Sequence, residues 1–264
     1  MAGEGRRLVV ADFAISLMWV SSNELIKILV QGALGNGANQ LEGDIAKWAL
    51  SLLNMFVIAY ISTLANGATY NPLTVLATAI SGDFSNFLFT VGARIPAQVV
   101  GSVYGARLIL LTFPGIERGP HLNVDIAKGA LTEGLLAFAI VIITLGLARE
   151  ITDDFFMKTW ISSLSKLTLH ILGSDLTGGC MNPASVMGWA FANKHHITKE
   201  HLIVYWLAPV EATLVAVWLF GILFGTKKDE QSDVKKATSP QQKSKNSDQP
   251  KSKKSDQQKS KKSD

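Results

Sequence analysis

The chain has 264 residues, of which 48% are hydrophobic and only 17% are charged, below the roughly 25% usual in soluble domains. Residues 226–264 carry a net charge of +6, whereas residues 1–225 carry −2. This distribution excludes a wholly basic nucleic-acid-binding domain and favours an apolar membrane body with a basic tail.

Six segments are apolar enough to be read as membrane spans, each of which needs about 20 residues. They cover 8–31, 46–65, 87–112, 129–148, 157–173 and 202–225. The fifth, MKTWISSLSKLTLHILG, is quite polar. The first reaches Asp12 after only four apolar residues, so we expect no cleavable signal peptide.

Two further segments, 71–80 and 182–192, begin like helices but are too short to cross a membrane. They read NPLTVLATAI and NPASVMGWAFA. In each, Asn is a good N-cap and Pro suits the first helical position. We therefore predict two half-helices that enter the membrane without crossing it.

The spans and half-helices repeat. Asp12 precedes Asn71 by 59 residues and Glu133 precedes Asn182 by 49, so each half contains three spans and one half-helix. Because three is odd, the second half enters the membrane inverted relative to the first. The predicted fold is an all-α membrane protein with six transmembrane helices, two re-entrant half-helices and an inverted 3+3 repeat.

The predicted boundaries place the first repeat at 1–115, the second at 116–225 and a Lys-rich tail at 226–264. The tail contains KSKKSD twice amid Gln, Ser and Pro, so we expect it to be disordered.

The two half-helix starts predict a pore for neutral molecules. Irregular backbone at membrane depth is tolerated only inside protein or against a water-filled cavity. The unpaired N–H groups and the positive ends of both helix dipoles would meet at the centre, beside the side chains of Asn71 and Asn182. Water can bond to these groups, whereas a cation meets a positive field.

These motifs resemble those of a known family. YNPLTVLA and MNPASVMGWAF are similar to the paired Asn-Pro-Ala boxes of the major intrinsic proteins, the aquaporins and their relatives. The resemblance covers about 8–225 and includes the acids of spans one and four. Within the family, the Asn-Pro-Leu box, the basic tail and the short N-terminus are most similar to the plant small basic intrinsic proteins, second subgroup.

The resemblance implies the residues of the pore. The half-helix boxes are Asn71, Pro72 and Leu73 in the first half and Asn182, Pro183 and Ala184 in the second. The four-residue constriction corresponds to Ser51, His170, Gly179 and Ser185. Water-selective relatives usually have Arg where Ser185 stands, so the expected constriction is wider and more polar than a strict water filter.

Leu73 has three more carbon atoms than the usual Ala, while the Asn cap and Pro are unchanged. We expect this bulk to loosen the contact between the half-helices or to intrude on the path, with low water flux as the result.

Other polar residues at membrane depth have structural interpretations. The resemblance implies that Asp12 and Glu133 anchor loop backbone N–H groups; a proton relay is the alternative. For Arg94 we expect snorkelling or a buried pair. His195, His196 and His201 are interpreted as solvated loop residues rather than a metal site.

The leading hypothesis is a passive channel for water or small neutral solutes, with membrane lipid around it and four copies per homotetramer, as in the family. We expect no enzyme activity, catalytic site, cofactor, metal or nucleic-acid partner; the single Cys180 excludes an intrachain disulfide. One alternative is a gated or proton-coupled transporter that uses His170 or Glu133. The other is a low-flux membrane interaction protein of the endoplasmic reticulum.

The expected location is the endoplasmic reticulum membrane. An even number of spans puts both termini on one side, and Arg6, Arg7 and the Lys-rich tail indicate the cytosol. The sequence KKSD resembles a di-lysine retrieval signal, although attraction to anionic lipid is an alternative role for the repeat.

Overall fold

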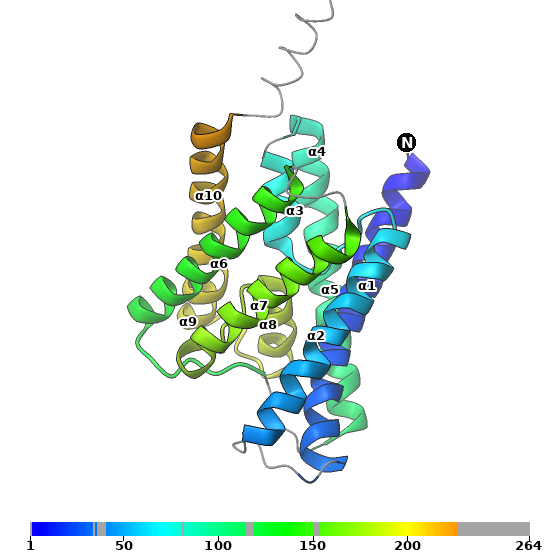
Figure 1. The fold of residues 1–264 in the computed structure, drawn as a ribbon, viewed down its shortest axis with the longest axis vertical. Helices are drawn as coiled ribbons and strands as arrows, with labels where there is room; N and C mark the ends of the chain where they lie inside the picture. Colours follow the sequence, from blue (N-terminus) through cyan, green and yellow to red (C-terminus); the bar gives the residue numbers. More distant parts are fainter. Residues whose placement is uncertain are drawn as a thin grey trace, which may run out of the picture. The chain divides into compact units, whose positions relative to one another are not determined.

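A computed structural model of the chain describes most of its apolar body and, within it, only helices and the turns that join them (Figure 1). The described residues are 2–33, 35, 41–80, 82–114, 119–149 and 154–225. The predicted tail, 226–264, lies outside them.

Six long helical segments account for the six predicted spans. They are α1 (Ala2–Ile28) with the π-helical turn η1 (Leu29–Ala33); α2 (Leu41–Leu64); α4 (Phe84–Phe89), η2 (Thr90–Arg94) and α5 (Ile95–Thr112); α6 (Ile126–Ala148); α7 (Phe155–Thr177); and α9 (Lys199–Leu202), η3 (Ile203–Leu207) and α10 (Ala208–Phe224). Among the described residues, all but the α7 segment are long and apolar enough to cross a membrane.

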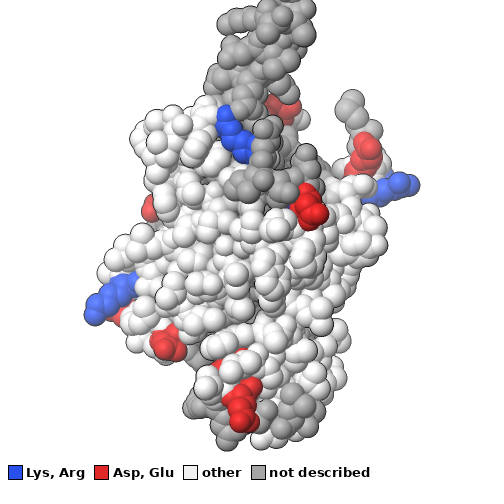
Figure 2. Space-filling model, viewed as in Figure 1, with Lys and Arg blue, Asp and Glu red and all other residues white. Residues whose placement is uncertain are grey.

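The charge distribution on the surface agrees with this assignment. On the face seen in Figure 2, charged side chains are few, and the middle of the face is uncharged. A lipid-facing surface requires such an uncharged region, because a charge at bilayer depth is costly.

The two half-helices are α3 (Pro72–Ile80) and α8 (Pro183–Ala192). At 1.5 Å per residue they are about 14 and 15 Å long, so that together they match the roughly 30 Å of a hydrocarbon core. Neither could cross alone. The fold class predicted from the sequence is therefore confirmed.

Each half-helix packs against spans of the opposite repeat. Leu73 and Ala77 of α3 share a buried cluster with Ala137 and Val141 of α6 and with Ala216 of α10. Trp189 of α8 packs in the same way with Val20 of α1 and with Ala106 and Ile109 of α5. This exchange joins the two repeats into one body.

The third span of each repeat contains a π-helical turn at an equivalent place. In both, the turn is followed by a helix with Pro in its first turn, at Pro96 and Pro209. Proline has no N–H to donate and disturbs the preceding helical turn, and π-turns are a common way to absorb such a break. The sequence analysis predicted neither turn.

Candidate functional site

The two half-helix starts hold each other in place. The side-chain oxygen of Asn71 caps α3 by accepting from the backbone N–H of Leu73 (3.0 Å), and that of Asn182 caps α8 by accepting from Ser185 (3.3 Å). The amide nitrogen of Asn71 donates to the carbonyl of Met181 (2.8 Å). That of Asn182 donates to the carbonyl of Tyr70 (3.3 Å). Each cap is thus bonded to the loop that precedes the other half-helix.

The two asparagines differ in what they can offer a passing molecule. Asn182 also donates to the hydroxyl of Ser185 (2.8 Å), so both of its amide hydrogens are used. Among the described residues, Asn71 donates to Met181 alone, which uses one amide hydrogen and leaves the second available. Ser185 accepts from Asn182 and keeps its own hydrogen to donate.

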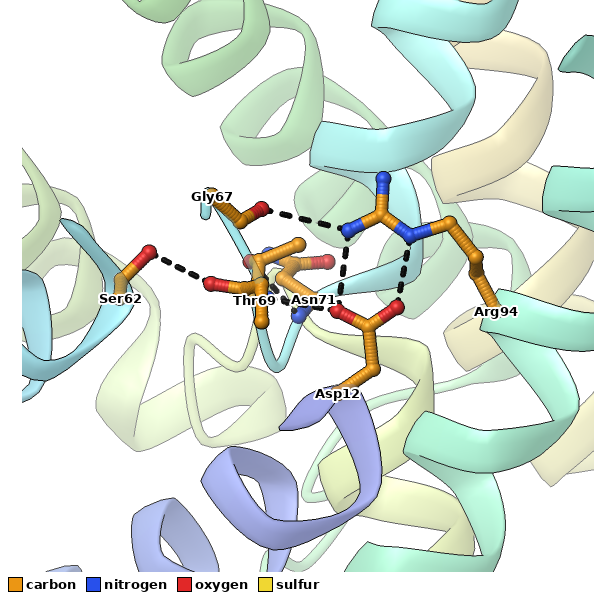
Figure 3. Close-up of polar contacts among 7 residues, drawn as sticks. Asp12, Ser62, Gly67, Thr69, Asn71 and Arg94 are labelled. Carbon is orange, nitrogen blue, oxygen red and sulfur yellow. Dashed lines mark hydrogen bonds and ion pairs between the residues drawn. The ribbon is translucent and has the colours of Figure 1, made fainter. Parts of the chain in front are cut away.

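Asp12 is completely buried and connects three elements of the first repeat (Figure 3). One carboxylate oxygen accepts from the backbone N–H of Thr69 (2.7 Å) in the loop before α3. Arg94 of η2 binds both oxygens, through Nε (2.6 Å) and Nη2 (2.9 Å), and also donates to the carbonyl of Gly67. Of the two alternatives considered for Arg94, the buried pair is the one observed.

Glu133 occupies the corresponding place in the second repeat and is 1% exposed. Its carboxylate accepts from the hydroxyl of Thr177 (2.7 Å) and from the backbone N–H groups of Cys180 (2.8 Å) and Met181 (2.9 Å). Cys180 and Thr69 each lie two residues before the capping Asn of their half. The two acids therefore bind equivalent backbone positions.

A cavity of about 330 Å³ contains the expected pore residues. Its walls include Ser51, His170, Gly179 and Ser185, together with both capping asparagines. The structure thus brings the four predicted constriction residues to one space.

Gly179 is required by its surroundings in this cavity. Its φ of +53° lies in the left-handed region, and a Cβ here would collide with the carbonyl oxygen of His170. The same close approach puts Nδ1 of His170 3.2 Å from the carbonyl oxygen of Gly179. The backbone around Gly179 therefore helps to orient the histidine ring.

Leu73 does not lie where the sequence analysis expected its bulk to act. Its side chain is 1% exposed, belongs to the cluster between α3, α6 and α10, and is not part of the cavity wall. The facing residues Ala137 and Ala216 are small, which leaves room for the leucine. Pro72, Pro183 and Ala184 are also buried.

A second cavity, of about 290 Å³, lies toward the other end of the spans. It is lined by hydroxyl-bearing residues near the end of α6 and the start of α7, whereas the larger cavity is lined by the end of α1, the start of α2 and the end of α7. Met55, Tyr70 and Lys166 line both cavities and so mark where they meet.

Tyr70 and Lys166 were not predicted as site residues. The Tyr70 ring stacks on Trp19 with centroids 4.0 Å apart, and the Lys166 ammonium lies 3.4 Å from the Tyr70 hydroxyl. A signal for Lys166 was present in the sequence: it precedes His170 by four residues, a spacing that puts both on one helix face.

The interpretation of the histidines near α9 as solvated is wrong for His201. This side chain is 4% exposed, and its Nε2 atom has no hydrogen-bond partner among the described residues. It lines a third cavity, of about 630 Å³, together with His121 and His195. In the part of the chain that the structure describes, no group of three or more metal-ligating side chains is present.

Six spans, two inverted repeats and two half-helices that meet at paired asparagines define a membrane channel fold. The sequence model described as Major intrinsic protein matches residues 4–220. The chain belongs to the major intrinsic protein family, whose members are membrane channels and not enzymes.

Similar proteins refine this assignment. The chain is 54% identical to the probable aquaporin SIP2-1 of Arabidopsis thaliana, over 86% of this chain and 96% of that protein. It is 47% identical to aquaporin SIP2-1 of Zea mays, over 86% of this chain and 92% of that protein. The predicted family and the predicted likeness to its plant subgroup are thereby confirmed.

A solved structure shares the fold at low sequence identity. It is the X-ray structure of the aquaglyceroporin from Plasmodium falciparum, with a TM-score of 0.64 and 16% identity, over 87% of this chain and 99% of that one.

Proposed function

We propose that the chain is a passive channel for water and small neutral solutes, with its constriction at Ser51, His170, Gly179 and Ser185. The observation that carries the proposal is the cavity of about 330 Å³ whose wall contains these four residues and both capping asparagines. Three of the four have small side chains, so we expect a path wide enough for solutes larger than water.

The polar groups in this cavity suit neutral molecules. Asn71 has an amide hydrogen to donate, and the Ser185 hydroxyl can both donate and accept. The positive ends of α3 and α8 act against cations at the same place. Water and small polyols can exchange hydrogen bonds with these groups at little cost.

We propose a structural role for the two buried acids. Both oxygens of Asp12 and both of Glu133 accept hydrogen bonds from donors that fix loops or neighbouring spans. A proton-coupled transporter would need one of these acids, or His170, to exchange protons during transport. The hydrogen bonds of the acids favour the passive channel.

Osmotic shock of reconstituted vesicles tests the proposal. The full chain in phosphatidylcholine vesicles should shrink or swell them faster than empty vesicles, as measured by stopped-flow light scattering, without any proton gradient. Flux that appears only with a pH gradient would indicate the transporter. No flux of water, glycerol or hydrogen peroxide would indicate the interaction protein.

A substitution at the constriction makes this test specific. Ser185→Arg should reduce glycerol flux about tenfold, because a long cationic side chain fills the space beside Asn182; tenfold corresponds to about 1.4 kcal/mol in the barrier. Ser174→Arg adds the same side chain to the wall of the same cavity, one turn beyond His170 on α7, and is the control for a general loss of space. Equal effects of both variants would argue against a constriction at Ser185.

We further propose that the chain forms a homotetramer with a pore in each copy, as the family resemblance implies. Native mass spectrometry of the detergent-solubilised protein tests this oligomeric state.

The proposed location is the endoplasmic reticulum membrane, with both termini cytosolic. This location is supported by the likeness to the plant subgroup and by the basic tail, and co-localisation of a tagged chain with markers of that membrane tests it.

A further inference from the structure

Lys166 lies at the point where the two cavities meet. It is in the middle of α7, and it lines both the cavity that contains the constriction and the one toward the start of α7. His170 lies one helical turn further along the same face and, of these two cavities, lines only the one that contains the constriction. A molecule that passes from one cavity to the other therefore passes the Lys166 side chain.

The ammonium of Lys166 is held by Tyr70, which is itself fixed. The ammonium lies 3.4 Å from the Tyr70 hydroxyl and 5.6 Å from the ring centroid, within cation–π range. The ring stacks on Trp19, and the Tyr70 carbonyl accepts from Asn182. The position of the charge is thus tied to the pair of half-helix caps.

Other lysines on the wall of the cavity that contains the constriction have carboxylate partners. Lys27 pairs with Glu24 at 3.1 Å, and Lys47 pairs with Asp44 at 2.7 Å. Lys166 forms no ion pair with any residue that the structure describes. Its charge is therefore not compensated by a carboxylate of the described residues, and it lies on the wall that the two cavities share.

We propose that Lys166, positioned by Tyr70, supplies the fixed side-chain charge that, together with the positive ends of α3 and α8, excludes cations from this channel. The four constriction residues bear no permanent positive charge. The fixed charge lies instead on the far side of the paired asparagines, where it repels any cation that passes between the cavities. This assignment rests on the proposed function and specifies how that pore selects against charge.

Charge substitutions in the full chain test the assignment. Lys166→Met keeps most of the side-chain length without the charge, and Lys166→Glu reverses the charge. Lys47→Glu reverses an ion-paired lysine on the wall of the same cavity and is the matched control. Each protein is reconstituted in phosphatidylcholine vesicles, and K⁺ flux under a KCl gradient and water flux under osmotic shock are measured on the same preparation.

The wild type and Lys47→Glu should stay impermeable to K⁺, whereas K⁺ permeability should rise about tenfold or more in Lys166→Glu and by less in Lys166→Met. Lys166→Glu vesicles that conduct water yet remain as K⁺-tight as the wild type would overturn the assignment, as would an equal leak in Lys47→Glu. If Lys166→Glu does not reconstitute, a K⁺-tight Lys166→Met overturns it. Absence of water flux in the wild type would instead contradict the proposed function, independently of the K⁺ result.

Discussion

Leu73 and Ala184 occupy the same position in the two half-helices, directly after the Asn-Pro pair, but they have different sizes. Leu73 fills a space bordered by Ala137, Val141 and Ala216 on the two neighbouring spans. Its contribution is therefore to the packing of α3 between α6 and α10. The leucine stabilises the half-helix that carries the Asn71 cap, and its side chain is turned away from the path.

Leu73→Ala is expected to lower the free energy of unfolding by about 2–5 kcal/mol, the range for truncation of a buried leucine. Water permeability per folded channel should not rise. Thermal unfolding in detergent and light scattering of vesicles measure the two effects. Leu172→Ala, at a leucine of α7 that is 68% exposed, is the control and should change stability little. A rise in water permeability with unchanged stability would show that Leu73 narrows the path after all.

At the scale of residues, the helix caps could be predicted from the sequence, whereas the side-chain contacts between helices could not. The Asn caps could be located because Asn followed by Pro favours a helix start through its own chemistry. The constriction positions came from offsets implied by the family resemblance. The direction of Leu73 and the contact of Lys166 with Tyr70 depend on how α3 and α7 are rotated against their neighbours, which spacing along the chain does not determine.

The elements that flank each half-helix are anchored in different ways. In the first repeat Asp12 connects α1, the loop before α3 and η2 through its ion pair with Arg94. In the second repeat Glu133 binds two backbone N–H groups and the Thr177 hydroxyl, and Tyr205 of η3 donates to the Thr177 carbonyl (2.8 Å). Among the described residues, a buried pair of opposite charges takes part in this anchoring in the first repeat and not in the second.

Asp12→Asn should therefore destabilise the fold by about 3–5 kcal/mol, because it leaves the charge of Arg94 without its partner in a buried place. The double variant Asp12→Asn with Arg94→Met should cost less than the sum of the single variants, since it removes the unpaired charge. Thermal unfolding of the three proteins measures this coupling. Lys128→Met, at an exposed ion pair with Asp125, is the control. Additive losses would indicate that Asp12 acts mainly through Thr69.

The existence and type of the helices were predictable, and their limits were less so. The predicted spans rested on apolar runs, but α4, α6 and α7 begin earlier, at N-caps formed by Asp83, Asp125 and Asp154. The amide N–H of Lys128 that donates to Asp125 also lowers the pKa of that carboxyl. An apolar run marks only the part of a helix that lies in the membrane. The polar residues at the start of each helix fall outside that run, so the predicted starts are too late.

At the scale of the whole molecule, the crosswise packing of the half-helices explains why two repeats form one channel. Leu73 and Ala77 of α3 are buried against spans four and six, and Trp189 of α8 is buried against spans one and three. Each repeat therefore supplies part of the packing around the half-helix of the other. Inversion was predictable from the odd number of spans per repeat, whereas the exchange of partners required the tertiary structure.

The last span runs from one side of the body to the other. The end of α10 lies on the same side as the N-terminus, and α9 lies at the opposite end of that span (Figure 1). If both termini are cytosolic, as proposed, His195, an exposed residue of the loop between α8 and α9, faces the lumen. A cysteine at His195 or at Asp248 in the tail, each in a Cys180→Ser background, reports the side of the membrane.

In sealed microsomes with the cytosolic face outward, a membrane-impermeant maleimide should label Asp248→Cys at once and His195→Cys only after detergent is added. The Cys180→Ser protein without a new cysteine gives the background. Labelling of His195→Cys in intact microsomes, with Asp248→Cys protected, would reverse the proposed orientation. Labelling of both in intact microsomes would contradict a membrane crossing by the last span between the two sites, because that crossing puts them on opposite sides of the membrane.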